Sequence, residues 1–326
     1  IDVENLDPQS LNVFGNGYGQ LPYENSIERP DDLLQNAIYI EGEGDGSFDE
    51  NDFILFYANG PDTWEFDETT NLFKHSKHLY TDTSYYFIGV NTGLQPKRIQ
   101  SISSTGSAPT KQVTTFNDYV FHELDRENVQ KSGRTWYGEK FDVQTTYSFE
   151  GDRFTFPNIL PTDSVYLDVA LMGRNTVTSS EFTFSVNNAS SQVTVPSTGT
   201  SATSNYGREV EAQLITTTSS PSLNVSFTFD KRNNPSASGW LDWFELNLKR
   251  DLRMARSQMK FRSSEAFGQG EVAQYLVSNS QSIQEIWKVT DPSNVKRVNF
   301  IQDQGVASYT LEASELEEFV AFTGSN

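Results

Sequence analysis

The sequence predicts an all-β, multi-domain protein, and three observations carry this prediction. Aromatic residues make up 13% of the chain, with 23 Phe and 14 Tyr, and such residues suit half-buried strand surfaces. Short apolar runs recur between Gly, Asn and Pro residues, as strands joined by tight turns require. Residues 181–186 and 223–229 alternate between apolar and polar side chains, which is typical of strands with one buried face. A chain of 326 residues is long enough for two or three domains.

The first predicted domain, residues 1–112, is small and β-rich. Its apolar runs lie at 12–14, 37–40, 53–58 and 84–90, with glycine-containing turns between them. Residues 101–115, which span the boundary between the first domain and the second, are rich in Ser and Thr. We interpret them as a linker.

The second predicted domain, residues 113–250, is a jelly-roll-like β-sandwich, because many short strands follow one another at regular spacing. Asn187 and Asn188 are expected to form the turn after the strand at 181–186. Residues 117–133 carry apolar side chains at mixed spacing, and we expect a short helix there.

The third predicted domain, residues 251–326, is a small β-sandwich module with strands near 286–290, 295–301, 307–311 and 318–322. The chain starts at Ile1 rather than Met and shows no signal peptide. We therefore expect it to be part of a longer protein.

The charge balance excludes several classes of partner. The chain has 24 basic and 44 acidic residues, a net charge of −20, whereas nucleic-acid binding requires clustered Lys and Arg. Adsorption to anionic lipid is excluded for the same reason. The charge fits a secreted surface protein or one that binds divalent cations, and it also fits plain solubility. There is no cysteine, which excludes disulfides, thiolate metal sites and a Cys nucleophile.

Three groups of segments carry a resemblance to a known family. The first group is V-F-G-N-G at 13–17, P-D-D-L at 30–33, A-I-Y-I-E-G-E at 37–43, D-G-S-F-D at 45–49, D-F-I-L-F-Y-A at 52–58 and G-P-D-T-W at 60–64. The second is W-Y-G-E at 136–139 with G-W-L-D-W at 239–243, and the third is I-W-K-V-T-D-P at 286–292 with E-F-V-A-F at 318–322. In this order they resemble the region before the catalytic domain in the PorU family of Bacteroidetes, the type IX secretion system sortases. The resemblance covers nearly the whole chain.

The resemblance implies a function for the longer protein. Sortases of this family act on the outer face of the outer membrane, where they remove the C-terminal sorting domain of secreted cargo. They then attach the cargo to anionic lipopolysaccharide by transpeptidation, in a complex with the β-barrel PorV and with PorQ and PorZ. Their gingipain-like catalytic domain (peptidase family C25) uses a Cys nucleophile and a His. The resemblance places this domain after the present region.

This chain is therefore expected to be a non-catalytic scaffold and docking surface for the catalytic domain and the attachment-complex proteins. It has no Cys, and its only histidines are His75, His78 and His122, so no catalytic residue carries over from the family. We expect a monomer. The alternative from a different class is a carbohydrate-binding module that recognises lipopolysaccharide or another glycan.

A candidate Ca²⁺ site lies in the acidic stretch 41–52. Spacing on the twelve-residue Ca²⁺ loop pattern puts a glycine, Gly46, at the sharp turn of position six and oxygen-bearing residues at the liganding positions. The candidate ligands are Glu41, Glu43, Asp45, Ser47, Asp49 and Asp52. The pattern departs from the usual one at its first, third and last positions, and its flanks are strands. The alternative is a solvated acidic turn with no ion.

Two weaker candidate sites are the histidine pair and the strand at 239–248. His75 and His78 are three residues apart, a spacing that suits zinc on a helix, but the lysines between and before them oppose a dication, and we expect two surface histidines. In the strand at 239–248, alternation predicts Trp240, Asp242 and Phe244 on one face. A sugar platform there would need an exposed Trp, whereas at least one Trp is expected in the core.

If the acidic stretch binds Ca²⁺, removal of the ion leaves its carboxylates to repel one another. EDTA is then expected to lower the melting temperature of the chain, and excess Ca²⁺ to restore it. A melting temperature that stays constant up to millimolar Ca²⁺ would contradict the prediction.

Overall fold

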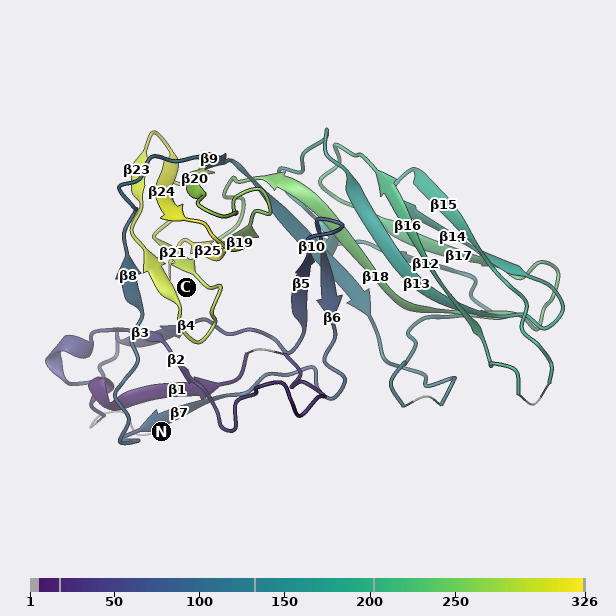
Figure 1. Cartoon of the computed structure of the whole chain (residues 1–326), viewed down its shortest axis with the longest axis horizontal. Coiled ribbons are helices and arrows are strands. Elements are labelled where there is room, and N and C mark those ends of the chain that lie inside the picture. The colour runs from purple at the N-terminus through teal and green to yellow at the C-terminus, as the bar shows by residue number, and fades with distance from the viewer. Residues whose placement is uncertain (1–5, 18, 132, 202, 325–326) are drawn as a thin grey trace. The chain divides into compact units, whose positions relative to one another are not determined.

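The computed structural model describes residues 6–17, 19–131, 133–201 and 203–324 (Figure 1). The chain forms two compact units. Unit 1 comprises Ile1–Glu65, Ser76–Phe116 and Leu252–Asn326, and unit 2 comprises Phe66–His75 and Asn117–Asp251. The described residues form 25 strands and three short 3-10 helices, η1 (Pro8–Ser10), η2 (Glu43–Asp45) and η3 (Asp152–Phe154). The predicted all-β fold class is confirmed.

Unit 2 is an antiparallel sandwich of two sheets. One sheet has the order β16-β13-β18-β10, with β11 also paired to β18, and the other has the order β12-β17-β14-β15. Strands β11, β18, β13 and β16 thus lie side by side in one sheet, and strands β12, β17, β14 and β15 in the other. This is the jelly-roll arrangement. The bounds are β10 (Thr115–Glu123), β11 (Lys140–Phe141), β12 (Thr146–Phe149), β13 (Val165–Arg174), β14 (Ser180–Val186), β15 (Ala189–Val195), β16 (Arg208–Thr216), β17 (Val225–Asp230) and β18 (Ser238–Asp251).

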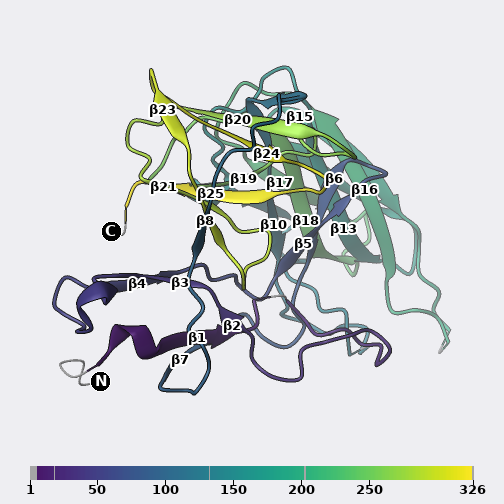
Figure 2. The ribbon, with the colours of Figure 1, turned by 60° about the vertical axis from the view of Figure 1, so that its left-hand side comes forward.

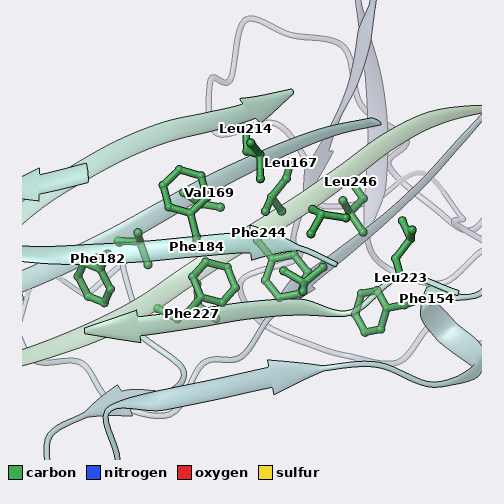
Figure 3. Close-up of a cluster of buried hydrophobic side chains, with 14 of the residues drawn as sticks. Phe154, Leu167, Val169, Phe182, Phe184, Leu214, Leu223, Phe227, Phe244 and Leu246 are labelled. Atoms are coloured by element: carbon green, nitrogen blue, oxygen red, sulfur yellow. The ribbon is translucent and has the colours of Figure 1, made fainter. Parts of the chain in front are cut away.

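The core of unit 2 is rich in aromatic side chains from both sheets (Figure 3). Along β14, Phe182 and Phe184 are fully buried, while the alternate residues Glu181 and Thr183 are partly exposed. Phe244 of the opposite sheet lies 5.4 Å from Phe227, measured between ring centroids. The alternation in the sequence therefore places one face of each strand in this core.

The turn after β14 follows its sequence. β14 and β15 form a hairpin in which Val186 pairs with Ala189, so Asn187 and Asn188 are the two loop residues. Asn187 has φ 51°, a left-handed conformation that Asn tolerates better than most residues and that two-residue hairpin loops require. The predicted turn is confirmed.

Strand β18 contains a β-bulge that the sequence does not reveal. Ala170 of β13 pairs with Trp243, but Leu171 pairs with Leu241, so Asp242 is the extra residue. Beyond the bulge the faces are exchanged. Phe244 lies in the inter-sheet core, whereas Trp240 packs on the other side with Tyr137 and Met172. The prediction that Trp240 and Phe244 share a face is therefore wrong.

The expected helix at 117–133 is also wrong, because its first residues form β10. Val120 packs against the inter-sheet core and His122 stacks on Phe244, with ring centroids 5.3 Å apart. The alternate residues Tyr119 and Phe121 lie on the other face of β10. There Tyr119 contacts Phe73, and Phe121 contacts His75. Both faces of this strand carry apolar side chains, so its sequence does not alternate.

Unit 1 is built from stacked β layers (Figures 1 and 2). A three-stranded sheet has the order β2-β1-β7, and β3 pairs with β4. The bounds are β1 (Leu11–Gly15), β2 (Gln35–Asn36), β3 (Ile38–Glu41), β4 (Phe53–Phe56) and β7 (Tyr86–Val90). The hairpin of β5 (Thr63–Asp67) and β6 (Leu72–Ser76) follows β4 and contributes its tip, residues 66–75, to unit 2.

The hairpin of β3 and β4 is apolar on both faces. Ile38 and Ile40 lie in one cluster with Leu11 and Val13 of β1, whereas Tyr39 packs in a second cluster that contains Trp287 and Val320. The hairpin therefore forms a middle layer between two apolar clusters of unit 1.

The remaining strands of unit 1 form a small sandwich of two sheets, ordered β19-β25-β21-β22-β8 and β23-β24-β20-β9. The bounds are β8 (Gln100–Ile102), β9 (Lys111–Val113), β19 (Gln258–Arg262), β20 (Val272–Ser278), β21 (Glu285–Lys288), β22 (Lys296–Val298), β23 (Ile301–Asp303), β24 (Val306–Glu312) and β25 (Glu318–Phe322).

Strands β8 and β9 complete this sandwich, although they come from a much earlier part of the chain. β8 pairs in parallel with β22, and β9 pairs in parallel with β20. The interpretation of residues 101–115 as a linker is therefore wrong at both ends of that stretch. The first and third sequence segments share one unit because these parallel pairs join them, and the segment 113–250 nearly coincides with the main part of unit 2.

None of the helices within the described ranges is long and apolar enough to cross a membrane.

The core of unit 2 gives a direct stability prediction. Val169 is 1% exposed in the inter-sheet core, so Val169→Ala removes two buried methyl groups and should lower the free energy of unfolding by about 2 kcal/mol. Val143 is 99% exposed in the same unit, so Val143→Ala is the matched control and should stay within about 0.5 kcal/mol of the wild type. Urea unfolding followed by tryptophan fluorescence measures both, and equal losses would contradict this packing.

Candidate functional site

The candidate Ca²⁺ ligands lie at the end of β3, where Glu41 is the last strand residue, and in the loop between β3 and β4. Gly42 and Gly46 have φ of 84° and 81°, which favours glycine, and between them η2 forms a single tight turn. A Cβ on Gly42 would lie 1.7 Å from an oxygen of Asp52. The loop is thus folded closely on itself, with Asp52 packed over Gly42.

The carboxylates of this loop do not converge on one point. Most of them pair with neighbouring groups of the protein. Glu43 forms an ion pair with Arg98, whose Nε lies 2.7 Å from Glu43 Oε2, and Glu41 accepts a hydrogen bond from the Tyr39 hydroxyl. That carboxylate raises the pKa of Tyr39. The two glutamates are therefore directed to different partners.

The remaining candidate ligands are held by the loop itself. Asp45 accepts the backbone N–H of Ser47 at 2.9 Å, and Asp52 accepts that of Asp49 at 2.8 Å. In the part of the chain that the structure describes, no group of three or more His, Cys, Asp and Glu side chains is placed to hold a metal ion. Ca²⁺ binding stays a prediction.

The histidines do not form a zinc pair. His78 Nδ1 accepts hydrogen bonds from the backbone N–H groups of Tyr80 and Thr81, both at 3.2 Å. The side chain of His75 is only 5% exposed, so the expectation of a surface residue is wrong for it. The sequence gives no sign of this burial, because the partners of His75 lie on strands far along the chain.

His75 lies between two carboxylates in unit 2. Its Nδ1 is 2.6 Å from Glu245 Oε2, and its Nε2 is 2.8 Å from Glu123 Oε2. The ring stacks on Phe121, with centroids 4.3 Å apart, and meets the edge of Trp243 at 5.2 Å. Burial alone lowers the pKa of His75, but the hydrogen bonds and charges of the two glutamates outweigh it and raise the pKa above its ordinary value.

Asp242, the bulge residue of β18, also has a displaced pKa. Burial, together with the nearby carboxylates of Glu123, Glu209 and Asp125, raises the pKa of Asp242 to about 7. This face of the sheet therefore concentrates acidic groups around the imidazole of His75. The cluster is accounted for as a buried charge network that holds the tip of the β5–β6 hairpin within unit 2.

His122 has a third structural environment. Its Nε2 lies 3.2 Å from Glu139 Oε2, and its ring stacks on Phe244 in the sandwich. Each of the three histidines is thus held by a carboxylate or by backbone groups, and the sequence contains no cysteine for any of them to activate.

The two halves of the second resemblance segment are neighbours in unit 2. The N–H of Gly138 donates to the carbonyl of Leu241 at 2.8 Å, and the N–H of Leu241 donates to the carbonyl of Glu139 at 2.9 Å. Trp240 is 1% exposed beneath this contact, so it offers no ring face to a sugar. Trp136, in contrast, is 40% exposed.

A cavity of about 250 Å³ lies in unit 1 between β4 and the sheet that contains β25. Its walls include Leu55, Tyr57, Trp287, Val320 and Phe322, and none of the residues that line it is charged. The volume suits one large side chain or one sugar ring. The uncharged lining provides no counter-charge for an anionic group.

Comparison with solved structures gives a match to the whole architecture. No protein-family model matches the sequence, and a comparison with curated proteins gives no match. A crystal structure of dimeric latent PorU from Porphyromonas gingivalis matches 97% of this chain with a TM-score of 0.77 and 20% sequence identity. The chain has the fold of part of PorU. It spans 29% of the length of that PorU chain.

Other similarities are weak. The Cry4Aa toxin of Bacillus thuringiensis matches 77% of this chain and 52% of its own, at 11% identity and a TM-score of 0.24. A cycloisomaltooligosaccharide glucanotransferase of Paenibacillus sp. matches 71% of this chain and 48% of its own, at 8% identity and a TM-score of 0.18. Neither TM-score supports an argument. The resemblance to the PorU family inferred from three sequence segments is thus confirmed at the level of the fold.

The raised pKa of Asp242 predicts a pH dependence of stability. The folded state keeps a proton on Asp242 at pH values where the unfolded chain has lost it, so stability falls as the pH rises from about 4 to 7. Asp242→Asn removes this loss. The difference in unfolding free energy between variant and wild type should therefore grow in favour of the variant, with a slope of up to about 1.4 kcal/mol per pH unit.

Urea unfolding at several pH values between 4 and 8 measures this difference. The raised pKa of His75 causes a loss of the same sign above about pH 6.5. Because His75 and Asp242 interact electrostatically, the range from pH 4 to 6, below the titration of His75, reports most directly on Asp242. The exposed Asp303 provides the control Asp303→Asn. Parallel stability curves for Asp242→Asn and wild type would show that Asp242 is ionised in the folded state throughout.

Proposed function

We propose that this chain is a non-catalytic part of a cell-surface sortase of the PorU kind, in which it serves as scaffold and docking surface. The observation that carries the proposal is the match to PorU over 97% of the chain at a TM-score of 0.77. Three sequence segments in the order expected for that family support it independently. The longer protein would remove sorting domains from type IX secretion cargo and attach the cargo to anionic lipopolysaccharide at the outer face of the outer membrane.

The chemistry of the residues supports a non-catalytic role for this chain. Cysteine peptidases need a thiolate beside an imidazole, and the sequence has no Cys. His75 and His122 are engaged by buried glutamates. The proposed catalytic domain would therefore belong to a different part of the longer protein.

The proposed partners are that catalytic domain, the barrel PorV, and the attachment proteins PorQ and PorZ. Of the five Trp residues, all within the described ranges, Trp136 is the one that is exposed. Exposed Trp residues are frequent energetic anchors of protein interfaces. We therefore assign Trp136 as an anchor for one of these partners.

Direct binding tests this proposal. The purified chain is immobilised and exposed separately to the gingipain-like domain of its own gene product, to detergent-solubilised PorV from the same organism, and to anionic lipopolysaccharide. Docking predicts saturable binding of at least one of the two proteins and at least a tenfold weaker affinity for Trp136→Ala. The surface control Val143→Ala should bind as the wild type does.

The alternative function, glycan recognition, predicts the opposite pattern. Saturable binding of lipopolysaccharide together with no binding of either protein would overturn the docking proposal.

A further inference from the structure

The tip of the β5–β6 hairpin is bound to the rest of unit 2 by side chains. In the described part of the chain, β6 pairs as a strand with β5 alone. Two side chains of β18 hold its backbone instead. Asn247 accepts the N–H of Phe73 at 2.8 Å and donates to the carbonyl of Phe73 at 2.9 Å. Glu245 accepts the N–H of His75 at 3.0 Å. An attachment of this kind can open without the loss of a strand ladder.

The contacts of the His75 ring depend on its protonation. Nδ1 and Nε2 lie 2.6 and 2.8 Å from carboxylate oxygens of Glu245 and Glu123. A neutral imidazole has one N–H, and an ionised carboxylate can only accept. Both contacts are therefore hydrogen bonds only when the ring and its two carboxylates hold one proton more than a neutral ring between two ionised carboxylates. Without that proton, one ring nitrogen directs its lone pair at a carboxylate oxygen.

The surroundings of the ring give water little access to replace a lost hydrogen bond. The side chains of His75, Glu245 and Glu123 are 5%, 4% and 14% exposed. Phe121 covers one face of the ring, and Trp243 meets it edge-on. A buried carboxylate that loses its charged partner is strongly destabilising. Loss of the proton therefore weakens the attachment of the tip.

Most of the other charged groups near the ring are acidic, and they favour the protonated ring. The neighbouring cations have other contacts: Lys74 pairs with Asp67 at 3.1 Å, and the guanidinium of Arg153 lies 5.6 Å from the centre of the Phe121 ring. Burial lowers the pKa of His75, but its two glutamates outweigh burial and raise it. The further carboxylates are Asp242 of β18, Asp125 after β10, Asp168 of β13, and Glu209 and Glu211 of β16.

We propose that the hairpin tip is a proton-operated clasp, docked on β10 and β18 while the His75 ring carries two protons and released as it loses one. The docked ring binds this proton more tightly than a released ring, so docking is favoured at acidic pH. It weakens as the pH rises above about 6.5, the ordinary value for a free imidazole. Because Glu65 and Ser76 on either side of the tip belong to unit 1, the clasp decides whether the hairpin is part of unit 2.

Hydrogen–deuterium exchange of the whole chain between pH 6 and pH 9, read by mass spectrometry, tests the clasp. Protection is calculated after division by the intrinsic exchange rate at each pH. We expect protection of residues 66–75 to fall by roughly tenfold for each unit by which docking raises the pKa of His75, while β13 keeps its protection. Constant protection of residues 66–75, or an equal fall in both segments, would overturn the proposal.

A histidine variant with a matched control separates the clasp from other titrations. His75→Gln removes the titratable ring, so protection of residues 66–75 should be low and independent of pH. His78 Nδ1 accepts backbone N–H groups of Tyr80 and Thr81, so His78→Gln is the control and should show the fall seen in the wild type. A wild-type fall that persists in His75→Gln would contradict the assignment to His75.

Asp242→Asn provides a third test, which keeps His75 in place. The charge of Asp242 acts on His75 and favours its protonated form. Removal of that charge should therefore move the fall in protection to lower pH, by about 0.5 unit or more. An unchanged or higher pH for the fall would contradict the electrostatic mechanism. None of these measurements depends on the proposed sortase partners.

Discussion

The hairpin of β3 and β4 is the constraint on which unit 1 depends, because its two faces belong to different apolar clusters. Ile38 and Ile40 pack toward β1, and Tyr39 packs toward Trp287. A hairpin buried on both faces requires a sheet on each side. The layer that contains β1 and β7 and the sheet that contains β25 supply these two covers. The cavity lies on one side of the hairpin, and the sheet that contains β7 lies on the other.

Local sequence patterns predicted the elements whose partners are close in the chain or whose burial is one-sided. The strand at 181–186 and its Asn187–Asn188 turn follow from alternation and from the conformational tolerance of Asn. The jelly-roll class followed from strand spacing. The alternation and the turn depend on neighbouring residues of the chain, so the local sequence contains the information that determines them.

The features that were missed depend on partners far away in the chain. Residues 101–115 read as a linker because Ser and Thr dominate, yet one end pairs with a strand 196 residues later and the other with a strand 162 residues later. The bulge at Asp242 reverses the faces of β18, and only the ladder with β13 reveals it. His75 is buried because Glu245 lies opposite it, at 170 residues' separation. For the acidic loop, spacing identified the carboxylates but not the ion pair that directs Glu43 to Arg98.

The central claim is that this chain supplies the architecture, and a different part of the longer protein supplies the chemistry. The most direct measurement is the sequence of the encoding gene downstream of the codon for Asn326. The account predicts that the reading frame continues into a gingipain-like domain in which a His is followed by a Cys. A frame that stops there, or that continues into an unrelated domain, would contradict the sortase assignment and leave a PorU-like fold with a function of its own.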